Sequence, residues 1–439
     1  MVARDTFVNV LLVELNQMID GSRLQGKISQ CRLCGNTNLV EILDLGDQEF
    51  TGVFPETVSS KVPHGPLTLV KCSDEDKGSC GLVQLRDSFD LNLLYGGNYG
   101  YRTGLNQSMV SHVESIAHKL EKVVSLGKGD VVLDIGSNDG TLLGSYRSQN
   151  ISRLGIDPSG LKFAEFYNKN IKLISEFFDQ KQYQKVFGDK KAKIISSIAM
   201  FYDLPDPLLF ANHVRNILAS DGIWAVELSY LPSMVAHTSY DTVCHEHLEY
   251  YGLTQLVWIC KELSLKIVDL DFNDVNGGSV CLFISHQRSS FPEAEELVAS
   301  VLKRENTLGL TNFEYYERFS QNVKDHKEKF VEQLDRLSDE KTLAGYGAST
   351  KGNVILQYCG ITSEIIPMIV DVNPFKYGRF TPGSHIPIVS EESILEASPS
   401  PDLFVVFPWH FKKNILDREK QFRKSGGQFL FPLPKIEII

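Results

Sequence analysis

The 439-residue sequence has no long hydrophobic run. No stretch of about 18 uninterrupted apolar residues occurs, so we expect no membrane span. An excess of positive charge is also missing, because 44 Lys and Arg stand against 55 Asp and Glu. The net charge of −11 argues against non-specific binding to nucleic acid, but not against a small phosphorylated ligand held by a few local cations. We find no low-complexity tract and no fixed-period repeat.

The composition that remains is typical of a globular protein. Hydrophobic residues make up 42% and charged residues 23%, which is too apolar for intrinsic disorder. At roughly 150 residues per domain, the length predicts about three domains. The first apolar run is interrupted by Glu14 and has no small-residue cleavage site, which favours an N-terminal helix or extension over a signal peptide. We therefore expect a cytoplasmic protein.

Four of the eight cysteines form two pairs. In a reducing cytoplasm, clustered cysteines are more often metal ligands than disulfides. Cys31 and Cys34 form a C-x-x-C knuckle followed by glycine, and Cys72 and Cys80 form a looser second pair around an acidic insert. Four thiolates predict a closed, tetrahedral, structural zinc site. The alternatives are that only the first pair forms a turn and the other thiols are buried, or that His64 replaces one cysteine.

The order of strand and helix patterns predicts the domain organisation. Short strand-like pieces surround the cysteines, a helical pattern covers 105–126, and apolar strands then alternate with helices from residue 131. This alternation predicts a parallel, doubly wound α/β sheet. A helical connector and a second α/β unit follow. The predicted parts are an N-terminal extension (1–27), a zinc-binding domain (28–88), a doubly wound domain (89–290) and a C-terminal Rossmann-like domain (291–439).

The first glycine-rich turn follows the strand that begins at Val131. Gly136 lets the backbone approach a ligand, and the helix that begins near Gly140 offers free N–H groups. Asp157 lies at the end of the next strand, where a carboxylate can accept both hydroxyls of a ribose. The G-x-G-x-x-G pattern of NAD sites is missing, and Asp139 would repel a pyrophosphate.

An acidic turn of this kind suits a cationic ligand with an α-amino group and a sulfonium. We therefore predict S-adenosylmethionine (SAM), with NAD or a fold without a ligand as the alternatives. The predicted cofactor-binding residues are Asp134, Gly136, Asn138, Asp139, Asp157 and Ser197.

A second glycine-rich turn, GYGASTKGN at 345–353, has hydroxyl side chains and one lysine but no acid. Backbone N–H groups, hydroxyls and a cation suit a phosphate, although the P-loop spacing is absent. We predict that Ser349 and Lys351 bind the substrate. The alternative is that the small residues only allow close helix–sheet packing.

The densest titratable segment is 240–251, which contains His245, Glu246 and His247. A neutral imidazole can remove a proton near pH 7, and a carboxylate can orient it. The segment follows a strand end, where open α/β sheets bind their ligands. The alternatives are a metal site or two histidines satisfied within a loop.

Five motifs in this order resemble the sugar C-methyltransferases of deoxysugar biosynthesis: the cysteine knuckle, Y-R-T-G-x-N, VLDIGSNDGTLL, HEH and GYGASTKGN. The resemblance covers nearly the whole chain after about residue 28. It implies an N-terminal zinc-binding domain, a SAM-binding class I methyltransferase domain of Rossmann-like fold and a C-terminal α/β domain. It also implies methylation of the carbon beside the ketone of a nucleotide-linked 4-keto-6-deoxy sugar, commonly C3 with a thymidine diphosphate (TDP) carrier.

The resemblance assigns the general base to His247, with Glu246 beside it. The family's tyrosine near the zinc module matches Tyr101, with Tyr99 as the alternative. Tyr101 or His245 would then hold the oxygen of the enolate.

Two positions depart from many relatives. Cys244 stands where they have tyrosine, and Tyr202 lies in a segment where they have histidine. Both would face the sugar, so the substrate or the stereochemistry is expected to differ.

Three other functions stay open at this stage. They are a SAM-dependent O- or N-methyltransferase acting on a sugar or another small metabolite, a nicotinamide-dependent sugar oxidoreductase, and a zinc-containing interaction protein without catalysis. The oligomeric state is open too, with a monomer preferred.

Overall fold

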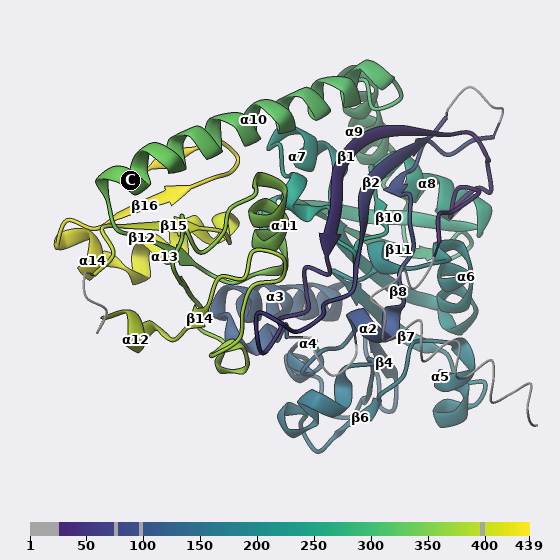
Figure 1. Cartoon of the computed structure of the whole chain (residues 1–439). Coiled ribbons are helices and arrows are strands. Elements are labelled where there is room, and N and C mark those ends of the chain that lie inside the picture. The colour runs from purple at the N-terminus through teal and green to yellow at the C-terminus, as the bar shows by residue number, and fades with distance from the viewer. Residues whose placement is uncertain (1–25, 74–77, 96–99, 396–399) are drawn as a thin grey trace, which may run out of the picture.

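The computed structural model describes residues 26–73, 78–95, 100–395 and 400–439. Nearly all of the predicted N-terminal extension (1–27), and Tyr99, lie outside these residues. Within the described residues the strands form three sheets, of four, seven and six strands (Figure 1). They follow the predicted order of a zinc-binding domain, a doubly wound domain and a C-terminal α/β domain. The predicted domain boundaries themselves stay a prediction.

The first sheet surrounds the cysteine pairs and is antiparallel throughout. Its strands, in spatial order, are β1 (Leu39–Glu49), β2 (His64–Cys72), β3 (Val83–Leu85) and β9 (Glu249–Tyr250). The last strand comes from much later in the chain and directly follows the HEH segment. It pairs with β3 through Val83 and Tyr250. The zinc-binding module and the HEH segment therefore share one sheet, which the sequence patterns did not predict.

The second sheet has the order β10-β11-β8-β7-β4-β5-β6. Its strands are β4 (Val131–Ile135), β5 (Ser152–Ile156), β6 (Ile171–Ile174), β7 (Ala192–Ile198), β8 (Leu218–Ser229), β10 (Leu265–Asn273) and β11 (Ser279–His286). The five strands from β8 to β6 are parallel, but β11 runs antiparallel to both of its neighbours. The predicted doubly wound sheet is confirmed, and it has one antiparallel strand, because a short loop joins β10 to β11 and produces antiparallel pairing.

Helices cover both faces of this sheet, as in a doubly wound fold. The helices of this part of the chain are α2 (Leu91–Leu94), α3 (Gln107–Val123), α4 (Thr141–Gly144), α5 (Gln180–Phe187), α6 (Pro207–Ile217), α7 (Leu231–Ala236), α8 (Leu253–Glu262) and α9 (Glu295–Leu308). Helix α3 packs on one face, and α5, α6 and α8 pack on the other. All five residues of β4 are buried, as expected for a central parallel strand covered on both sides.

The short 3-10 helices lie in the segments that connect the strands and the longer helices. They are η1 (Thr103–Leu105), η2 (Gly160–Phe166), η3 (Phe201–Asp203), η4 (Tyr240–Thr242), η5 (Val275–Gly277), η6 (Pro374–Lys376) and η7 (Trp409–Phe411).

The third sheet forms the C-terminal α/β unit, with the order β14-β13-β12-β15-β16-β17. Its strands are β12 (Leu343–Tyr346), β13 (Ile369–Val370), β14 (Ile388–Val389), β15 (Leu403–Val406), β16 (Gln428–Phe431) and β17 (Glu437–Ile438). Its helices are α10 (Phe313–Glu340), α11 (Thr350–Cys359), α12 (Glu391–Leu395), α13 (Lys412–Arg418) and α14 (Lys420–Lys424).

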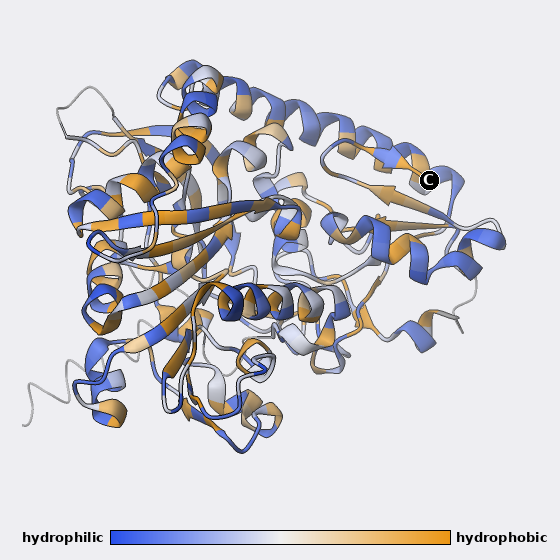
Figure 2. Cartoon of the chain, turned by 180° about the vertical axis from the view of Figure 1, so that it is seen from behind, coloured by the Kyte–Doolittle hydropathy of each residue, from blue (hydrophilic) through white to orange (hydrophobic). Residues whose placement is uncertain are grey.

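Helix α10 connects the C-terminal unit to the zinc-binding module. Its 28 residues span about 42 Å, and it packs against both α11 and β1 (Figure 1). Its buried residues recur every three or four positions, from Tyr316 to Leu337, so one stripe faces the core. The rest of its surface is largely hydrophilic (Figure 2). Across the described ranges, no helix combines the length and the apolar character that crossing a membrane requires.

Candidate active site

The four predicted zinc ligands lie together. Cys31 and Cys80 have their sulfur atoms 3.6 Å apart, as do Cys34 and Cys72, and all four sulfurs lie within 4.8 Å of one another. Sulfurs bound tetrahedrally to one zinc ion at about 2.3 Å are about 3.8 Å from each other, so the group fits this metal. His64 lies at the opposite end of β2 and pairs with Asp47 instead. A site with four cysteine ligands has no open position, so its role is structural.

The first glycine-rich turn has the backbone shape that a close ligand requires. Gly136, Asn138 and Gly140 all have positive φ, at 74°, 49° and 75°. The turn is acidic and buried, since Asp134, Asp139 and Asp157 are each at most 6% exposed. Burial, together with the charge of the nearby Asp157, raises the pKa of Asp134 to about 7. Carboxylates concentrated around an open turn favour a cationic ligand, so the residues fit SAM better than a pyrophosphate.

Asp157 already holds the turn in shape. Its Oδ2 accepts the Asn138 N–H at 2.8 Å, and its Oδ1 accepts the backbone N–H and the hydroxyl of Ser159. A carboxylate has about four acceptor positions, so three are used and about one is left for a ribose hydroxyl. For Asp157 to accept both ribose hydroxyls, as expected, Ser159 would have to give up one of its two hydrogen bonds to this carboxylate.

The segment 101–104 lies against the same turn. Asn138 donates to the Tyr101 carbonyl at 3.1 Å and accepts from the Thr103 N–H at 2.9 Å, while Asp139 accepts from the Gly104 N–H at 2.9 Å. The Y-R-T-G motif is therefore placed next to the cofactor turn. The Tyr101 ring is 46% exposed, and the surrounding protein raises the pKa of its hydroxyl to about 12, so the group stays protonated at neutral pH.

Ser197 does not reach the turn. It is fully buried, and its hydroxyl accepts the Trp224 indole N–H at 3.2 Å. The preceding residue, Ser196, points to the other face of β7 and donates to Asp134 Oδ1 at 2.5 Å. Sequence reasoning missed Ser196, although alternation along the strand would have separated the two serines. It also missed Tyr167, whose hydroxyl donates to the Asn138 carbonyl at 2.9 Å.

The loop after β7 connects the cofactor turn to the HEH segment. A Cβ placed on Gly136 would lie 2.9 Å from Met200 Cγ, so Met200 covers the turn. Two residues later, the ring of Tyr202 contacts the ring of His247, with centroids 4.6 Å apart. The Tyr202 carbonyl also accepts the Leu248 N–H at 2.8 Å. Met200 and Tyr202 are only two residues apart, about 7 Å of extended chain, so one short loop contacts both the cofactor turn and His247.

His247 has the form that a general base needs. Its Nδ1 lies 2.7 Å from the Thr242 carbonyl, which can only accept, so Nδ1 bears the proton and Nε2 has the free lone pair. Burial, and to a smaller extent the charge of Lys351, lower the pKa of His247 to about 4. The imidazole is therefore neutral at physiological pH.

His245 occupies a different environment. It is fully buried, its ring packs against Phe50 and Phe89 at centroid distances of 4.6 and 4.9 Å, and its Nε2 donates to the Gly65 carbonyl. Burial lowers the pKa of His245 to about 4. These contacts hold the HEH segment to the zinc-binding module, and we leave His245 out of the catalytic group.

Glu246 and Cys244, which precede the base in the sequence, are both buried. Glu246 is 6% exposed, and a Cβ on Gly52 would lie 2.2 Å from its Oε1, so glycine leaves the space that the carboxyl group fills. Burial raises the pKa of Glu246. Cys244 is fully buried, and burial together with the nearby Glu246 raises the pKa of its thiol. A thiol with no exposed surface does not face a substrate, so the expected contact of Cys244 with the sugar has no support.

The two predicted phosphate ligands differ in their surroundings. Ser349 caps α11 by accepting the Gly352 N–H at 3.0 Å. Lys351, in the first turn of α11, donates to the Asn276 carbonyl at 3.0 Å and therefore reaches across to the methyltransferase-like sheet. Its role as a phosphate ligand stays a prediction, and its position is considered further below.

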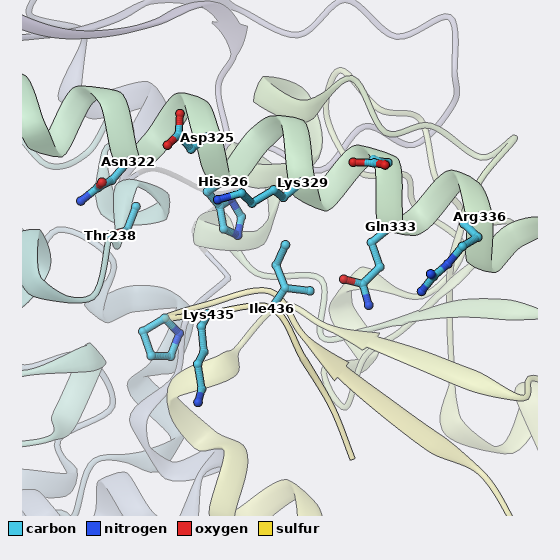
Figure 3. Close-up of a pocket in the computed structure, with 11 residues that line it drawn as sticks. Thr238, Asn322, Asp325, His326, Lys329, Gln333, Arg336, Lys435 and Ile436 are labelled. Atoms are coloured by element: carbon cyan, nitrogen blue, oxygen red, sulfur yellow. The ribbon is translucent and has the colours of Figure 1, made fainter.

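A separate open groove of about 650 Å³ lies between α10 and the C-terminal segment (Figure 3). Lys329, Arg336 and Lys435 line it together with Asp325 and Glu332, so its charges nearly balance. At its floor, both ring nitrogens of His326 are bonded, to the Tyr240 hydroxyl and to the Pro432 carbonyl. The imidazole of His326 therefore has no free ring nitrogen in this groove.

Known families match the chain in three consecutive segments. A family described as a zinc binding domain matches residues 31–95, one described as a methyltransferase domain matches 109–270, and one described as a C-methyltransferase C-terminal domain matches 274–434. C-methyltransferase NovU from Streptomyces niveus is 29% identical over 417 residues, which cover 94% of this chain and 97% of NovU.

Solved structures resemble part of the chain more weakly. LepI in complex with SAM aligns with 42% of this chain and 54% of its own, at 14% identity and a TM-score of 0.33. An O-methyltransferase family protein from Burkholderia thailandensis aligns with 42% of this chain and 59% of its own, at 13% identity and a TM-score of 0.32. These scores are too low to support a conclusion, so the fold assignment depends on the strand order and the matched domains.

The matched domains and the strand order define a SAM-dependent methyltransferase of the class I fold with an N-terminal zinc-binding domain, and they confirm the predicted fold and cofactors. More narrowly, the C-terminal domain match and the similarity to NovU identify it as a C-methyltransferase. The resemblance predicted from the motifs is confirmed at this level.

Proposed function

We propose that this C-methyltransferase acts on the carbon beside the ketone, C3, of a nucleotide-linked 4-keto-6-deoxy sugar in deoxysugar biosynthesis. TDP is the expected nucleotide. The observation that supports this most is the loop 200–202, because Met200 covers the cofactor turn while Tyr202 contacts His247. A base beside the methyl donor suits a substrate that must lose a proton from carbon before it is methylated.

The ketone at C4 makes the C3 proton acidic, because the electron pair left behind is delocalised onto oxygen. His247 takes this proton on Nε2, while its Nδ1–H stays bonded to the Thr242 carbonyl. Tyr202, packed edge to face on the imidazole, restricts the ring to this orientation. Glu246 is buried against Gly52, where it helps to hold the HEH segment in place.

Asp134, Asp139 and Asp157 would hold SAM at the turn through their negative charge and their remaining acceptor positions. When bound, SAM supplies an electrophilic methyl group, and its sulfur keeps the electron pair of the broken bond. The electron pair of the broken C3–H bond forms the new carbon–carbon bond, so the ketone is restored and no further proton is needed. Placing the two reacting carbons next to each other supplies much of the acceleration.

Solvent exchange tests this proposal. The zinc-loaded protein is incubated in D₂O with S-adenosylhomocysteine and a TDP-linked 4-keto-6-deoxy sugar, and the sugar is analysed by NMR. We expect deuterium to enter C3 in the presence of the protein. Methylation of an oxygen or a nitrogen needs no carbon acid, so methylation with SAM without any deuterium at carbon would contradict the proposal and favour an O- or N-methyltransferase.

A further inference from the structure

A lysine from the C-terminal domain lies beside the base. Lys351 is in the first turn of α11, and α11 packs against η4, whose Thr242 carbonyl fixes His247. The Lys351 Nζ donates to the Asn276 carbonyl at 3.0 Å. That carbonyl belongs to a turn in which Asn276, Gly277 and Gly278 all have positive φ, at 57°, 92° and 120°. Glycine adopts such φ values without strain, so Gly277 and Gly278 suit this tight turn.

Two further contacts fix the first turn of α11. Asn353 donates to the Thr51 carbonyl at 2.7 Å, and a Cβ on Gly52 would lie near both Glu246 Oε1 and Thr350 Oγ1, at 2.2 and 3.7 Å. The start of α11 is therefore held between the zinc-binding module and the HEH segment.

Polar atoms without partners surround the lysine. Asp241 is fully buried, and the Trp409 indole donates to its Oδ2 at 2.8 Å, but its Oδ1 has no hydrogen-bond partner. Among the described residues, the Lys351 Nζ has one hydrogen-bond acceptor, the Asn276 carbonyl, so two of its three N–H donors have no acceptor. A half-buried cation with free donors, near a buried carboxylate oxygen without a partner, leaves donors and an acceptor for a polar ligand.

The proposed reaction needs a cation at this place. His247 is neutral but weakly basic, because its pKa is lowered to about 4. A weak base removes a proton from carbon only if the charge that develops on oxygen is strongly stabilised. The carbonyl oxygen is two bonds away from the carbon that loses the proton, so its partner must lie next to the base. His245 cannot be this partner, because its ring is enclosed between Phe50 and Phe89 and its Nε2 is bonded to the Gly65 carbonyl.

We propose that the ammonium group of Lys351 binds the C4 oxygen of the substrate and stabilises the enolate. This inference depends on the proposed function and adds a catalytic residue to it. The proton of C3 passes to His247 Nε2, the electron pair moves onto the C4 oxygen opposite Lys351, and it then returns to form the carbon–carbon bond. Lys351 keeps its own protons throughout, so the step is balanced without another reactant.

The charged groups around the lysine are consistent with this role. Asp241 and Cys244 face it from the HEH side, and His410 faces it from η7. Burial lowers the pKa of Lys351, and Asp241 and Cys244 raise it. Burial also lowers the pKa of His410, and Lys351 lowers it further, so this second imidazole stays neutral. Lys351 is thus the cation that Asp241, Cys244 and His410 all face.

The test compares Lys351→Met with Lys413→Met, whose lysine is exposed on α13 in the same domain. For each variant, the measurements are deuterium entry at C3 with S-adenosylhomocysteine, kcat and KM for methylation, SAM affinity by calorimetry, and the pH profile of the exchange rate. We expect Lys351→Met to lower exchange and kcat at least about 100-fold with SAM affinity unchanged. Lys413→Met should match the wild type.

The pH profile separates catalysis from structure. Removing the positive charge raises the pKa of His247, so the acidic limb of the remaining activity should move to higher pH. A raised KM with unchanged kcat and an unmoved profile would overturn the inference and favour the phosphate role. Lys351→Gln, with circular dichroism, checks that a loss of activity is not a loss of folding. If the wild type itself shows no exchange, the proposed function fails, and the inference fails with it.

Discussion

His247 is the residue on which the proposed chemistry depends. Its Nδ1–H is committed to the Thr242 carbonyl, so replacement removes the one lone pair placed beside the cofactor turn. We expect His247→Ala to lower methylation at least about 100-fold. Calorimetry should give the same SAM affinity as the wild type, because the turn at Gly136–Gly140 does not contact this ring. His64→Ala, an exposed histidine of the zinc-binding module, is the matched control. Unchanged turnover in His247→Ala would refute the assignment of the base.

Replacement of Asp157 tests whether the cofactor turn binds SAM. Its carboxylate both fixes the Asn138 N–H and keeps about one acceptor position for a ligand hydroxyl. We expect Asp157→Ala to weaken SAM binding at least about 10-fold, as loss of hydrogen bonds to a charged group does. The measurement is calorimetric titration with SAM, with Asp189→Ala at an exposed position as the control. Equal affinities in the two variants would show that Asp157 does not serve the cofactor.

The buried His245 is expected to make the stability of the fold depend on pH. Its pKa is lowered from 6.5 to about 4 by burial, so between these values the unfolded chain binds a proton that the folded chain does not. This imidazole therefore destabilises the fold progressively as the pH falls from about 6.5 towards 4, and has little effect above pH 7. His245→Phe, which suits the contacts with Phe50 and Phe89, removes the effect.

Urea denaturation at pH 7 and pH 5 measures this difference. When the pH falls from 7 to 5, the unfolding free energy of His245→Phe should rise by about 2 kcal/mol relative to that of the wild type. Comparing the variant with the wild type cancels the contributions of the other titrating groups. A difference that stays constant with pH would mean that His245 titrates normally in the folded protein.

At the scale of elements, β9 links the zinc site to the base. It follows His247 directly and pairs with β3, and the Leu85 N–H donates to the Leu248 carbonyl at 2.8 Å. Arg32, between the two knuckle cysteines, reaches Glu249 with its Nε at 3.8 Å from Oε1. We therefore expect a zinc ion held by the four cysteines to stabilise the strand that follows the base.

Removal of zinc by a chelator should loosen β9 more than the cofactor turn. We expect hydrogen exchange of the Leu85 amide to accelerate at least about 10-fold, since its partner strand loses its support. The Gly136 amide, which donates to the Ile156 carbonyl at 2.9 Å in the seven-stranded sheet, is the internal control. If both amides keep their protection, the metal does not support the HEH segment.

Elements with long or regular patterns could be predicted from the sequence, and short ones could not. The uniformly apolar strand β4 and the periodic helix α3 form within a few residues of the predicted positions, and the long helix α10 forms in the predicted helical connector. The strand β9 has only two residues, so it has no period to detect. Its pairing with β3 depends on tertiary packing, which local sequence does not encode.

At the scale of the whole molecule, the candidate site is assembled from all three parts of the chain. The methyltransferase domain supplies the cofactor turn and His247, the zinc-binding module supplies Thr51 and Gly52, and the C-terminal domain supplies Lys351. Motif spacing predicted the four cysteines and the acidic turn, because each is a local pattern. It could not predict that Lys351 reaches Asn276, since this contact forms only when two domains pack together.

The position of the transferred methyl group tests the central claim most directly. The zinc-loaded protein is incubated with SAM labelled with ¹³C in its methyl group and with a TDP-linked 4-keto-6-deoxy sugar, and the product is analysed by NMR. We predict a labelled methyl group bonded to C3, coupled to the sugar carbons, and lost in His247→Ala. A labelled methyl group on oxygen or nitrogen, or transfer to carbon that persists without His247, would contradict the account.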